Sequence, residues 1–264
     1  MIKIKKNEDI KENIEFKNPL VIIGFPGIAM VGKFAVETLI KHFKAKPLFW
    51  LFYQDMPAQA MVAVSAKMRL PKTIFYFVTG EEREKASLDR DLIFITGDEQ
   101  PTSSAGIYYF ADFICKKCKE FNSKEIIATG AFIPEHVQQE DRLVYISGTT
   151  KEQIDFFLKS ETKLTKLMNG GYIAGANGVI PAWSNIHYEM DGVCLLAEAY
   201  PMLQRDPRAS KSILMVLNER YNINVDMSLF DKEIKEIESV SQEFKDYLGK
   251  KTKDKLRTQQ NYYG

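Results

Sequence analysis

Residues 20–33 read Leu20-Val-Ile-Ile-Gly-Phe-Pro-Gly-Ile-Ala-Met-Val-Gly-Lys33 and set the pattern for the chain. The first four form a short apolar run between Pro19 and Gly24, which predicts a buried strand. Residues 24–27 predict a turn. Beyond the turn, apolar residues recur every three or four positions as far as Phe43, which predicts an amphipathic helix.

The same alternation continues outward from this stretch. Further apolar runs predict strands at 47–53, 61–68, 73–78, 92–96, 125–129, 143–146 and 193–197. Helices are predicted at 105–121, 151–160 and 206–221, the last with Asp206 as N-cap and Pro207 as its first residue. Short apolar strands that alternate with longer helices predict an α/β fold, with a mostly parallel or mixed sheet covered by helices on both faces.

The overall charge excludes some classes of partner. Among 264 residues, 36 are basic and 35 acidic, so the net charge of +1 gives no general attraction to nucleic acid or to anionic membranes. The chain contains no uncharged apolar stretch of about 18 residues and no signal-peptide pattern. Three cysteines suit a reducing compartment. We therefore expect a cytoplasmic protein without a nucleic-acid or membrane partner.

A P-loop spacing occurs in the opening stretch, from Gly27 through Gly32 to Lys33. The match fails at the next residue, because Phe34 stands where a Ser or Thr would hold Mg²⁺. The four spacer residues resemble the interior of a helix. We therefore interpret the glycines as packing residues at a strand–turn–helix junction, with nucleotide binding as the weaker alternative.

Other chemistry-bearing residues form no recognisable catalytic or metal site. Cys115 and Cys118 make a lone CxxC inside a predicted helix, so we interpret them as packing residues, with a thioredoxin-like site as the alternative. His42, His136 and His187 are far apart in sequence and lie in no ligand motif. We predict no catalytic residue, no metal and no cofactor.

A pocket is predicted at the carboxyl ends of the strands, where α/β sheets commonly bind ligands. Asp98 and Glu99 either line this pocket or are solvated loop acids; Glu198 either lines it or is a hydrogen-bonded structural acid. The candidate pocket residues are Gly24, Pro26, Gly27, Asp98, Asn177, Gly178 and Glu198.

The C-terminal part of the chain differs from the rest. We predict an α/β domain over 1–227, a helix over 228–248 and a mobile basic tail over 249–264, which ends Tyr262-Tyr263-Gly264. Two tyrosines on a polar terminus have no core to join, and tyrosine suits an anchor in a partner's pocket. The alternative is that these tyrosines are incidental.

Four segments, taken in order, resemble the archaeal branch of the proteasome assembly chaperone 2 family. The first is Gly24-Phe-Pro-Gly-Ile-Ala-Met-Val-Gly32, which is similar to that family's Gly-x-Pro-Gly-x-x-x-Val-Gly signature. The others are Thr96-Gly-Asp-Glu-Gln-Pro101, Gly175-Ala-Asn-Gly-Val-Ile180, and Leu195-Leu-Ala-Glu-Ala-Tyr200 followed by Asp206-Pro207.

The resemblance implies a three-layer α/β/α core, distantly similar to nucleoside phosphorylases. It implies a homo-oligomer, a tetramer or pentamer, that acts in proteasome assembly or binding without ATP and is not an enzyme. Some members end in a hydrophobic-Tyr-any motif. Carried over, Tyr262 is the hydrophobic residue, Tyr263 the tyrosine and Gly264 the terminal carboxylate, which would contact α-subunits of the proteasome core particle.

An alternative function also fits the resemblance. A phosphorylase-like core is compatible with a nucleoside-like small-molecule binder, or an enzyme, that uses the strand-end pocket. The sequence leaves open the oligomer number. It also leaves open whether the protein assists assembly, opens the gate or caps the ring.

Overall fold

The computed structural model describes residues 1–10, 14–135, 141–200, 202–237 and 239. The chain divides into two compact units, Met1–Val225 and Asp226–Gly264. In the second unit the described residues are helical over 228–237. The end of the predicted helix 228–248 and the whole predicted tail 249–264 lie outside the described residues.

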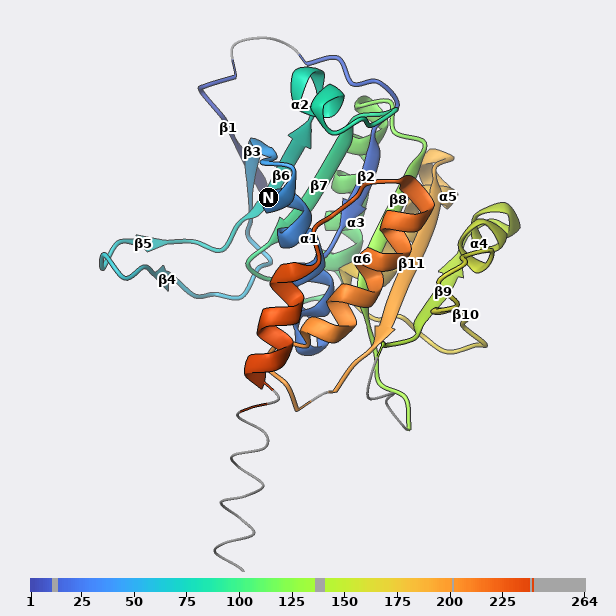
Figure 1. Ribbon diagram of the computed structural model, residues 1–264. Helices are drawn as coiled ribbons and strands as arrows, with labels where there is room; N and C mark the ends of the chain where they lie inside the picture. Colours follow the sequence, from blue (N-terminus) through green and yellow to red (C-terminus); the bar gives the residue numbers. More distant parts are fainter. Residues whose placement is uncertain (11–13, 136–140, 201, 238, 240–264) are drawn as a thin grey trace, which may run out of the picture. The chain divides into compact units, whose positions relative to one another are not determined.

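The first unit is built on a nine-stranded mixed sheet (Figure 1). Its spatial order is β1-β3-β6-β7-β2-β8-β11-β9-β10. The central strands β7, β2, β8 and β11 are parallel, and antiparallel strands flank them. The strands are β1 (Ile2–Lys6), β2 (Leu20–Ile23), β3 (Lys46–Tyr53), β6 (Thr73–Val78), β7 (Leu92–Gly97), β8 (Glu125–Phe132), β9 (Val144–Gly148), β10 (Thr165–Leu167) and β11 (Asp191–Glu198).

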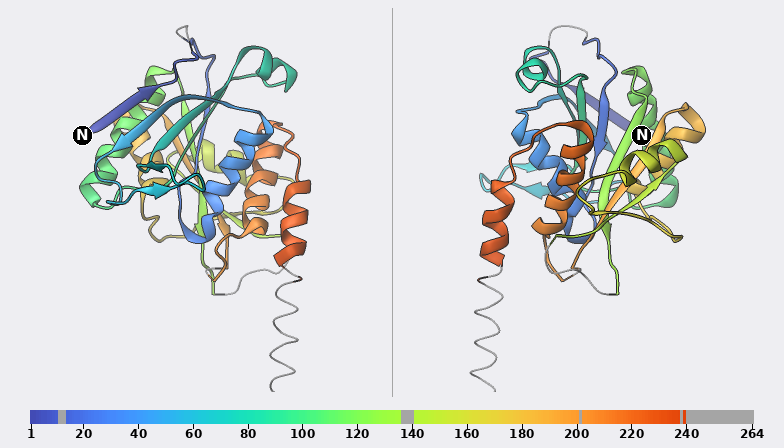
Figure 2. Two further views of the ribbon diagram at one scale, coloured as in Figure 1. Left: turned by 90° about the vertical axis from the view of Figure 1, so that its left-hand side faces the viewer. Right: turned by 45° about the vertical axis from the view of Figure 1, so that its right-hand side comes forward.

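Helices cover both faces of this sheet, so the predicted α/β layering is confirmed (Figure 2). Helices α1 (Val31–His42) and α6 (Pro207–Tyr221) pack together on one face, and α3 (Ser104–Glu120) and α5 (Ala176–Tyr188) on the other. The shorter helices are η1 (Ile28–Met30), α2 (Gly80–Lys85) and α4 (Lys151–Leu158). The predicted N-cap of α6 is confirmed, because the Asp206 carboxylate accepts a hydrogen bond from Ala209 N at 3.1 Å.

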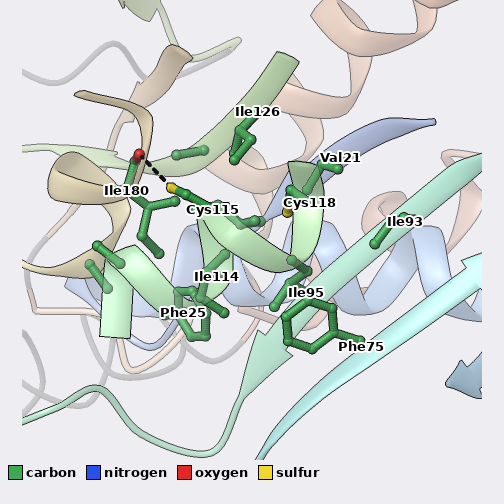
Figure 3. Packing of buried hydrophobic residues seen from close by; sticks show 14 of the residues in the cluster. Val21, Phe25, Phe75, Ile93, Ile95, Ile114, Cys115, Cys118, Ile126 and Ile180 are labelled. Carbon is green, nitrogen blue, oxygen red and sulfur yellow. Dashed lines mark hydrogen bonds between the residues drawn. The ribbon is translucent and has the colours of Figure 1, made fainter. Parts of the chain in front are cut away.

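Strand β2 lies at the centre of the core, and its four side chains are completely buried. Phe25 and both cysteines of the CxxC pack in the core between the sheet and α3 (Figure 3). Burial raises the pKa of the Cys115 and Cys118 thiols, which keeps them protonated. The Cys115 thiol also lies 3.5 Å from Ile180 O, to which it donates. The interpretation of these cysteines as packing residues is confirmed.

Some elements were not predicted. Residues 1–18 were treated as weakly patterned, yet β1 pairs antiparallel with β3 along five residues. Helices α2 and α5 and strand β10 were also missed. Helix α5 contains Pro181, which has no N–H to bond Asn177 O. That carbonyl accepts from the buried Cys194 thiol instead, at 3.4 Å.

The prediction of one strand over 61–68 is wrong. These residues form a hairpin of two short strands, β4 (Met61–Val62) and β5 (Met68–Arg69). The chain reverses because Ala66 adopts a left-handed conformation with φ +59°, and Ala63 N donates to Lys67 O. Val62 and Val64 favour extended backbone, and no Gly, Pro, Asn or Asp in 61–68 marks a turn, so propensity alone did not reveal it.

No helix within the described ranges has both the length and the apolar character needed to cross a bilayer.

Candidate functional site

The junction between β2 and α1 is held closely against β8 by two glycines. A Cβ on Gly32 would lie 2.0 Å from Thr129 O, and a Cβ on Gly24 would lie 2.2 Å from Gly32 O. The single Thr129 hydroxyl hydrogen lies between two backbone acceptors, Ile23 O at 2.9 Å and Gly32 O at 3.1 Å from Oγ1, and can be donated to either. This confirms the interpretation of the P-loop-like spacing as a packing junction.

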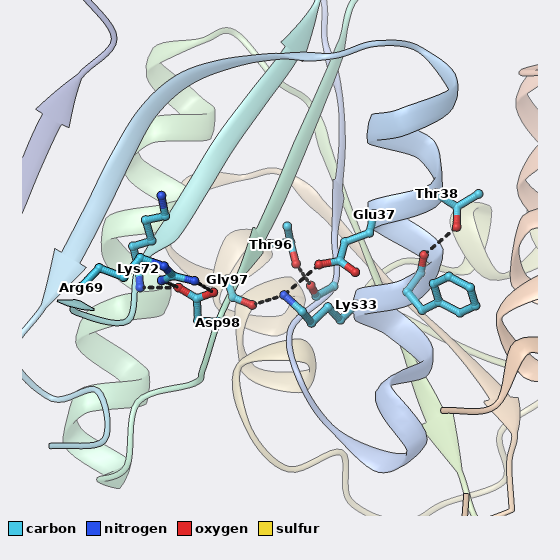
Figure 4. A network of polar contacts seen from close by, with 10 residues as sticks. Lys33, Glu37, Thr38, Arg69, Lys72, Thr96, Gly97 and Asp98 are labelled. Atoms are coloured by element: carbon cyan, nitrogen blue, oxygen red, sulfur yellow. Dashed lines mark hydrogen bonds and ion pairs between the residues drawn. The ribbon is translucent and has the colours of Figure 1, made fainter. Parts of the chain in front are cut away.

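Lys33 is committed to contacts within the fold (Figure 4). Its Nζ donates to Gly97 O at 2.7 Å and pairs with Glu37 at 3.0 Å. The neighbouring Thr96 hydroxyl donates to Gly24 O at 2.6 Å. The lysine therefore fastens α1 to the end of β7.

Two amide side chains tie the 24–27 loop to the start of α5. Asn177 accepts from Phe25 N at 3.1 Å and donates to Phe25 O at 3.3 Å. Gln100 accepts from Ala176 N at 2.7 Å and donates to Pro26 O at 2.5 Å. These four bonds satisfy backbone groups that the loop and the helix start would otherwise leave unpaired. We call Gly24–Gly32 with Gln100, Thr129 and Asn177 the strand-end junction.

A cavity of about 360 Å³ opens at this junction, beside the carboxyl ends of β8 and β11. The chain leaves β2 and β8 in different directions here, as at the switch points where α/β sheets bind ligands. Its lining is Phe25, Gly27, Ile28, Gly32, Gln100, Gly130, Ala131, Phe132, Ile133, Met168, Tyr172, Ile173, Ala174, Asn177 and Leu196. Among the described residues, no carboxylate, amine, imidazole or thiol lines this cavity. Its polar side chains among the described residues are those of Gln100, Asn177 and Tyr172, which can form hydrogen bonds with a bound ligand.

The structure brings only some of the predicted pocket residues together. Gly27 and Asn177 line the cavity, and Gly178 lines an adjacent hollow of about 370 Å³. Gly24 and Pro26 belong to the junction without lining either space.

Asp98 lies away from the cavity, at the base of the β4–β5 hairpin. Its carboxylate forms a bidentate ion pair with Arg69, at 2.5 and 2.9 Å, and accepts from Lys72 N at 3.0 Å (Figure 4). Burial alone would raise the pKa of Asp98, but these hydrogen bonds outweigh it and lower the pKa below its ordinary value. The adjacent Glu99 accepts a hydrogen bond from the side chain of Gln59, which lies just before β4.

Glu198 is a buried acid at the end of β11 and does not line the cavity. The Tyr145 hydroxyl donates to it at 3.3 Å. Burial, and then the Glu198 charge, raise the pKa of Tyr145. This geometry is that of a hydrogen-bonded structural acid.

The remaining candidates do not converge on a metal or redox site. Within the described ranges, no group of three His, Cys, Asp or Glu side chains is placed to hold a metal ion. The His42 ring packs edge-on against Phe43, and the His187 ring lies 3.9 Å from that of Trp183. His136 lies outside the described residues, as do Tyr262, Tyr263 and Gly264.

The predicted pocket residues did not include several residues of this site, among them Gln100, Thr129 and Tyr172. Gln100 bridges the 24–27 loop and α5, whereas the acids that precede it, Asp98 and Glu99, form no hydrogen bond with that loop in the part of the chain that the structure describes. Tyr172, whose side chain is fully exposed, lies at the edge of the cavity in a loop that had no predicted element. Gln100 lies between the end of a predicted strand and Pro101, and this position could have indicated a residue near the strand-end pocket.

Comparison with known proteins gives a consistent result. A model of the PAC2 family matches residues 21–245. An uncharacterized protein of Methanocaldococcus jannaschii is 29% identical over 249 residues, which cover 94% of this chain and 90% of that protein. A second one from the same organism is 26% identical over 233 residues, 87% of this chain and 86% of the relative.

Solved structures share the fold. Pyrococcus furiosus PbaB, an archaeal proteasome activator, superposes with a TM-score of 0.82 at 26% identity, over 92% of this chain and 98% of PbaB. Pyrococcus furiosus PbaA, an archaeal homolog of proteasome-assembly chaperone, gives a TM-score of 0.73 at 19% identity, over 100% of this chain and 99% of PbaA. At 19% identity, the likeness to PbaA concerns the fold alone.

Proposed function

This chain belongs to the PAC2 family, and on that basis we propose that it is a proteasome assembly chaperone homologue that binds the α-ring of a proteasome core particle through its C-terminal tail, without ATP. The observation that carries this proposal is the likeness over nearly the whole chain to PbaB, an archaeal proteasome activator.

In this proposal the tail residues Tyr262 and Tyr263 and the Gly264 carboxylate enter a pocket between neighbouring α-subunits. The segment from Gly249 to Gly264 reaches about 50 Å when fully extended and averages roughly 20–25 Å as a flexible chain. Its basic residues would steer it toward an acidic rim.

The binding energy of one tail is small, so the proposal includes a homo-oligomer. Two buried tyrosines and one carboxylate pair contribute about 5–8 kcal/mol gross. Ordering three or four residues removes several kcal/mol of this. Several tails on one oligomer would gain avidity through effective concentration.

A co-purification assay with the matching core particle tests this function. We expect Tyr263→Ala, and a chain ending at Asn261, to lose most binding and most peptidase stimulation, with or without ATP. The matched control Gln259→Ala changes the tail outside the motif and should bind as the unaltered chain does. Equal binding by all four proteins would contradict the tail mechanism.

The cavity at the switch point favours a second candidate, a nucleoside-like small-molecule binder. A ligand with a millimolar Kd would stabilise the fold by about 1.4 kcal/mol at tenfold excess. Thermal unfolding with a panel of nucleosides and nucleotides measures this, and an unchanged midpoint at 10 mM ligand would count against binding.

A further inference from the structure

The β4–β5 hairpin projects from the body of the first unit as an arm (Figures 1 and 2). We define the hairpin arm as residues 58–70, of which 62–70 are all exposed. Its side chains are mostly apolar: Val62 is 65% exposed, Val64 fully exposed and Met68 75% exposed. The arm contains no acidic residue.

An arm of this kind lacks the support that a hairpin needs within one chain. Its ladder consists of two residue pairs, Met61 with Arg69 and Val62 with Met68. An isolated two-stranded hairpin is marginal in water, and both of its edges expose unpaired backbone groups. Exposed valine and methionine on such edges favour association with another protein surface.

The base of the arm is nevertheless fixed to the body. The bidentate Arg69–Asp98 ion pair and the Lys72 N–Asp98 bond hold one side, and Gln59 donates to Glu99 at 2.7 Å on the other. An anchored base directs the arm outward in one orientation. That arrangement suits an arm positioned for a partner better than an unconstrained loop.

A groove of about 530 Å³ lies beside the base of the same arm. Apolar side chains dominate its lining, among them Met1, Tyr53, Met56, Pro57 and Leu70. Leu70 and Ala60, which also lines the groove, are the residues from which the arm rises. Val64 lies four residues beyond Ala60, a chain span of up to about 13 Å, and does not line its own groove.

We infer that the arm of one copy seats its Val62, Val64 and Met68 side chains in the groove of a second copy of this chain. Arm and groove are different surfaces of one molecule, so each copy can give its arm to one neighbour and receive the arm of another, and such a contact builds a ring where the rotation between copies closes. A copy that both gives its arm and receives another would bury Val62, Val64 and Met68 in one contact and Met1 and Leu70 in the other. Together these residues expose several hundred Å² per copy, so each single contact is smaller than the roughly 800 Å² per partner of a standard interface, and a copy that makes two of them approaches that area. The inference rests on the homo-oligomer of the proposed function and identifies the surface that forms it.

The first experiment measures assembly by analytical ultracentrifugation. The triple variant V62S/V64S/M68S should raise the dissociation constant at least about tenfold and shift the chain toward monomer, because three apolar side chains lose their burial. Its matched control is Ile186→Ser on α5, where an equally exposed side chain (75%) lies outside the arm. We expect the control to assemble as the unaltered chain does.

The second experiment identifies the two contacting surfaces by disulfide formation. The native thiols of Cys115, Cys118 and Cys194 are buried, so an introduced surface cysteine is the reactive one. Val64→Cys and Gln54→Cys, one at the tip and one in the groove, should form a mixed disulfide when combined and little dimer when oxidised separately.

The outcomes separate this inference from the proposed function. Unchanged assembly of the triple variant, or dimers of Val64→Cys alone, would overturn the arm-in-groove contact and leave tail binding to be judged by co-purification. A monomeric unaltered chain would overturn both the arm contact and the avidity argument. If the triple variant loses assembly and the mixed disulfide forms, the inference stands, whether or not the tail binds a core particle.

Discussion

At the strand-end junction nearly every polar group is bonded inside the fold, whereas the hairpin arm exposes apolar side chains and bonds to the body only at its base. The amides of Asn177 and Gln100 each donate one hydrogen bond to a backbone atom and accept another from one. Two glycines allow α1 to pack closely against β8. In the arm, nine consecutive residues are exposed. The residues of the family signature therefore pack the junction together, while the exposed apolar surface of the arm lies in a segment where no signature was recognised.

Gly32→Ala should break this contrast most severely. The new Cβ would lie 2.0 Å from Thr129 O, a backbone atom of a central strand that cannot move aside. We expect a loss of about 3 kcal/mol or more in the free energy of unfolding, or no folded protein. Gly27→Ala is the matched control, because its nearest neighbour would be 3.9 Å away and its backbone is extended. Equal stability of the two variants in urea titrations would contradict the packing role.

Asn177→Ala tests the hydrogen bonds of the junction. It leaves Phe25 N and Phe25 O without their partner in a buried setting. The expected loss is about 1–3 kcal/mol in the free energy of unfolding. Gln59→Ala removes an exposed amide bond and should change stability by less than about 0.5 kcal/mol. If both variants unfold at the same urea concentration, the junction does not depend on Asn177.

Asp98→Asn tests the anchor of the arm through its pH dependence. The pKa of Asp98 is lowered in the folded chain, so its carboxylate stabilises the fold above the ordinary value of 3.8, and this contribution is lost as pH falls through the lower folded value. We expect Asp98→Asn to be less stable at pH 6 by under about 1 kcal/mol, since Arg69 is partly exposed.

The measurement is urea unfolding of both proteins between pH 7 and pH 3. The difference between them should stay constant down to about pH 5 and shrink as pH approaches 3. If the difference in stability between the two proteins does not change with pH, the charge of Asp98 does not contribute to the anchor.

Val64→Ser should have the smallest effect on the folded chain itself. Its side chain is fully exposed, so the free energy of unfolding at a concentration where the chain is monomeric should change by less than about 0.5 kcal/mol. A larger loss in the free energy of unfolding would mean that Val64 stabilises the fold of its own chain.

Local patterns were sufficient to predict the central layers of the fold. The buried runs of β2 and β7 and the Asp206-Pro207 start of α6 depend on neighbouring residues, and each was correctly predicted. Strand β1 was missed because its lysines suit an edge strand, whose pairing with β3 is a long-range contact.

The candidate site was less accessible to sequence reasoning. Asp98 and Glu198 were considered for the pocket because both follow strands, but side-chain partners decided where they point. Asp98 forms an ion pair with Arg69 of the hairpin, and Glu198 accepts a hydrogen bond from Tyr145 inside the fold. A hairpin that reverses at Ala66 could not be distinguished from one strand without its ladder.

The central position of β2 also bears on how the chain folds as it is synthesised. Ile23 pairs with Ile95 and Ala128, so the most buried strand emerges from the ribosome about 105 residues before its last neighbour. At 5–20 residues per second this interval lasts roughly 5–20 s. For about the first 70 residues of this interval, until β7 has been made, the four apolar side chains of β2 have no neighbouring strand, and the edge that pairs with β8 stays open until the interval ends. The segment that organises the finished fold is thus the one exposed longest while the protein is made.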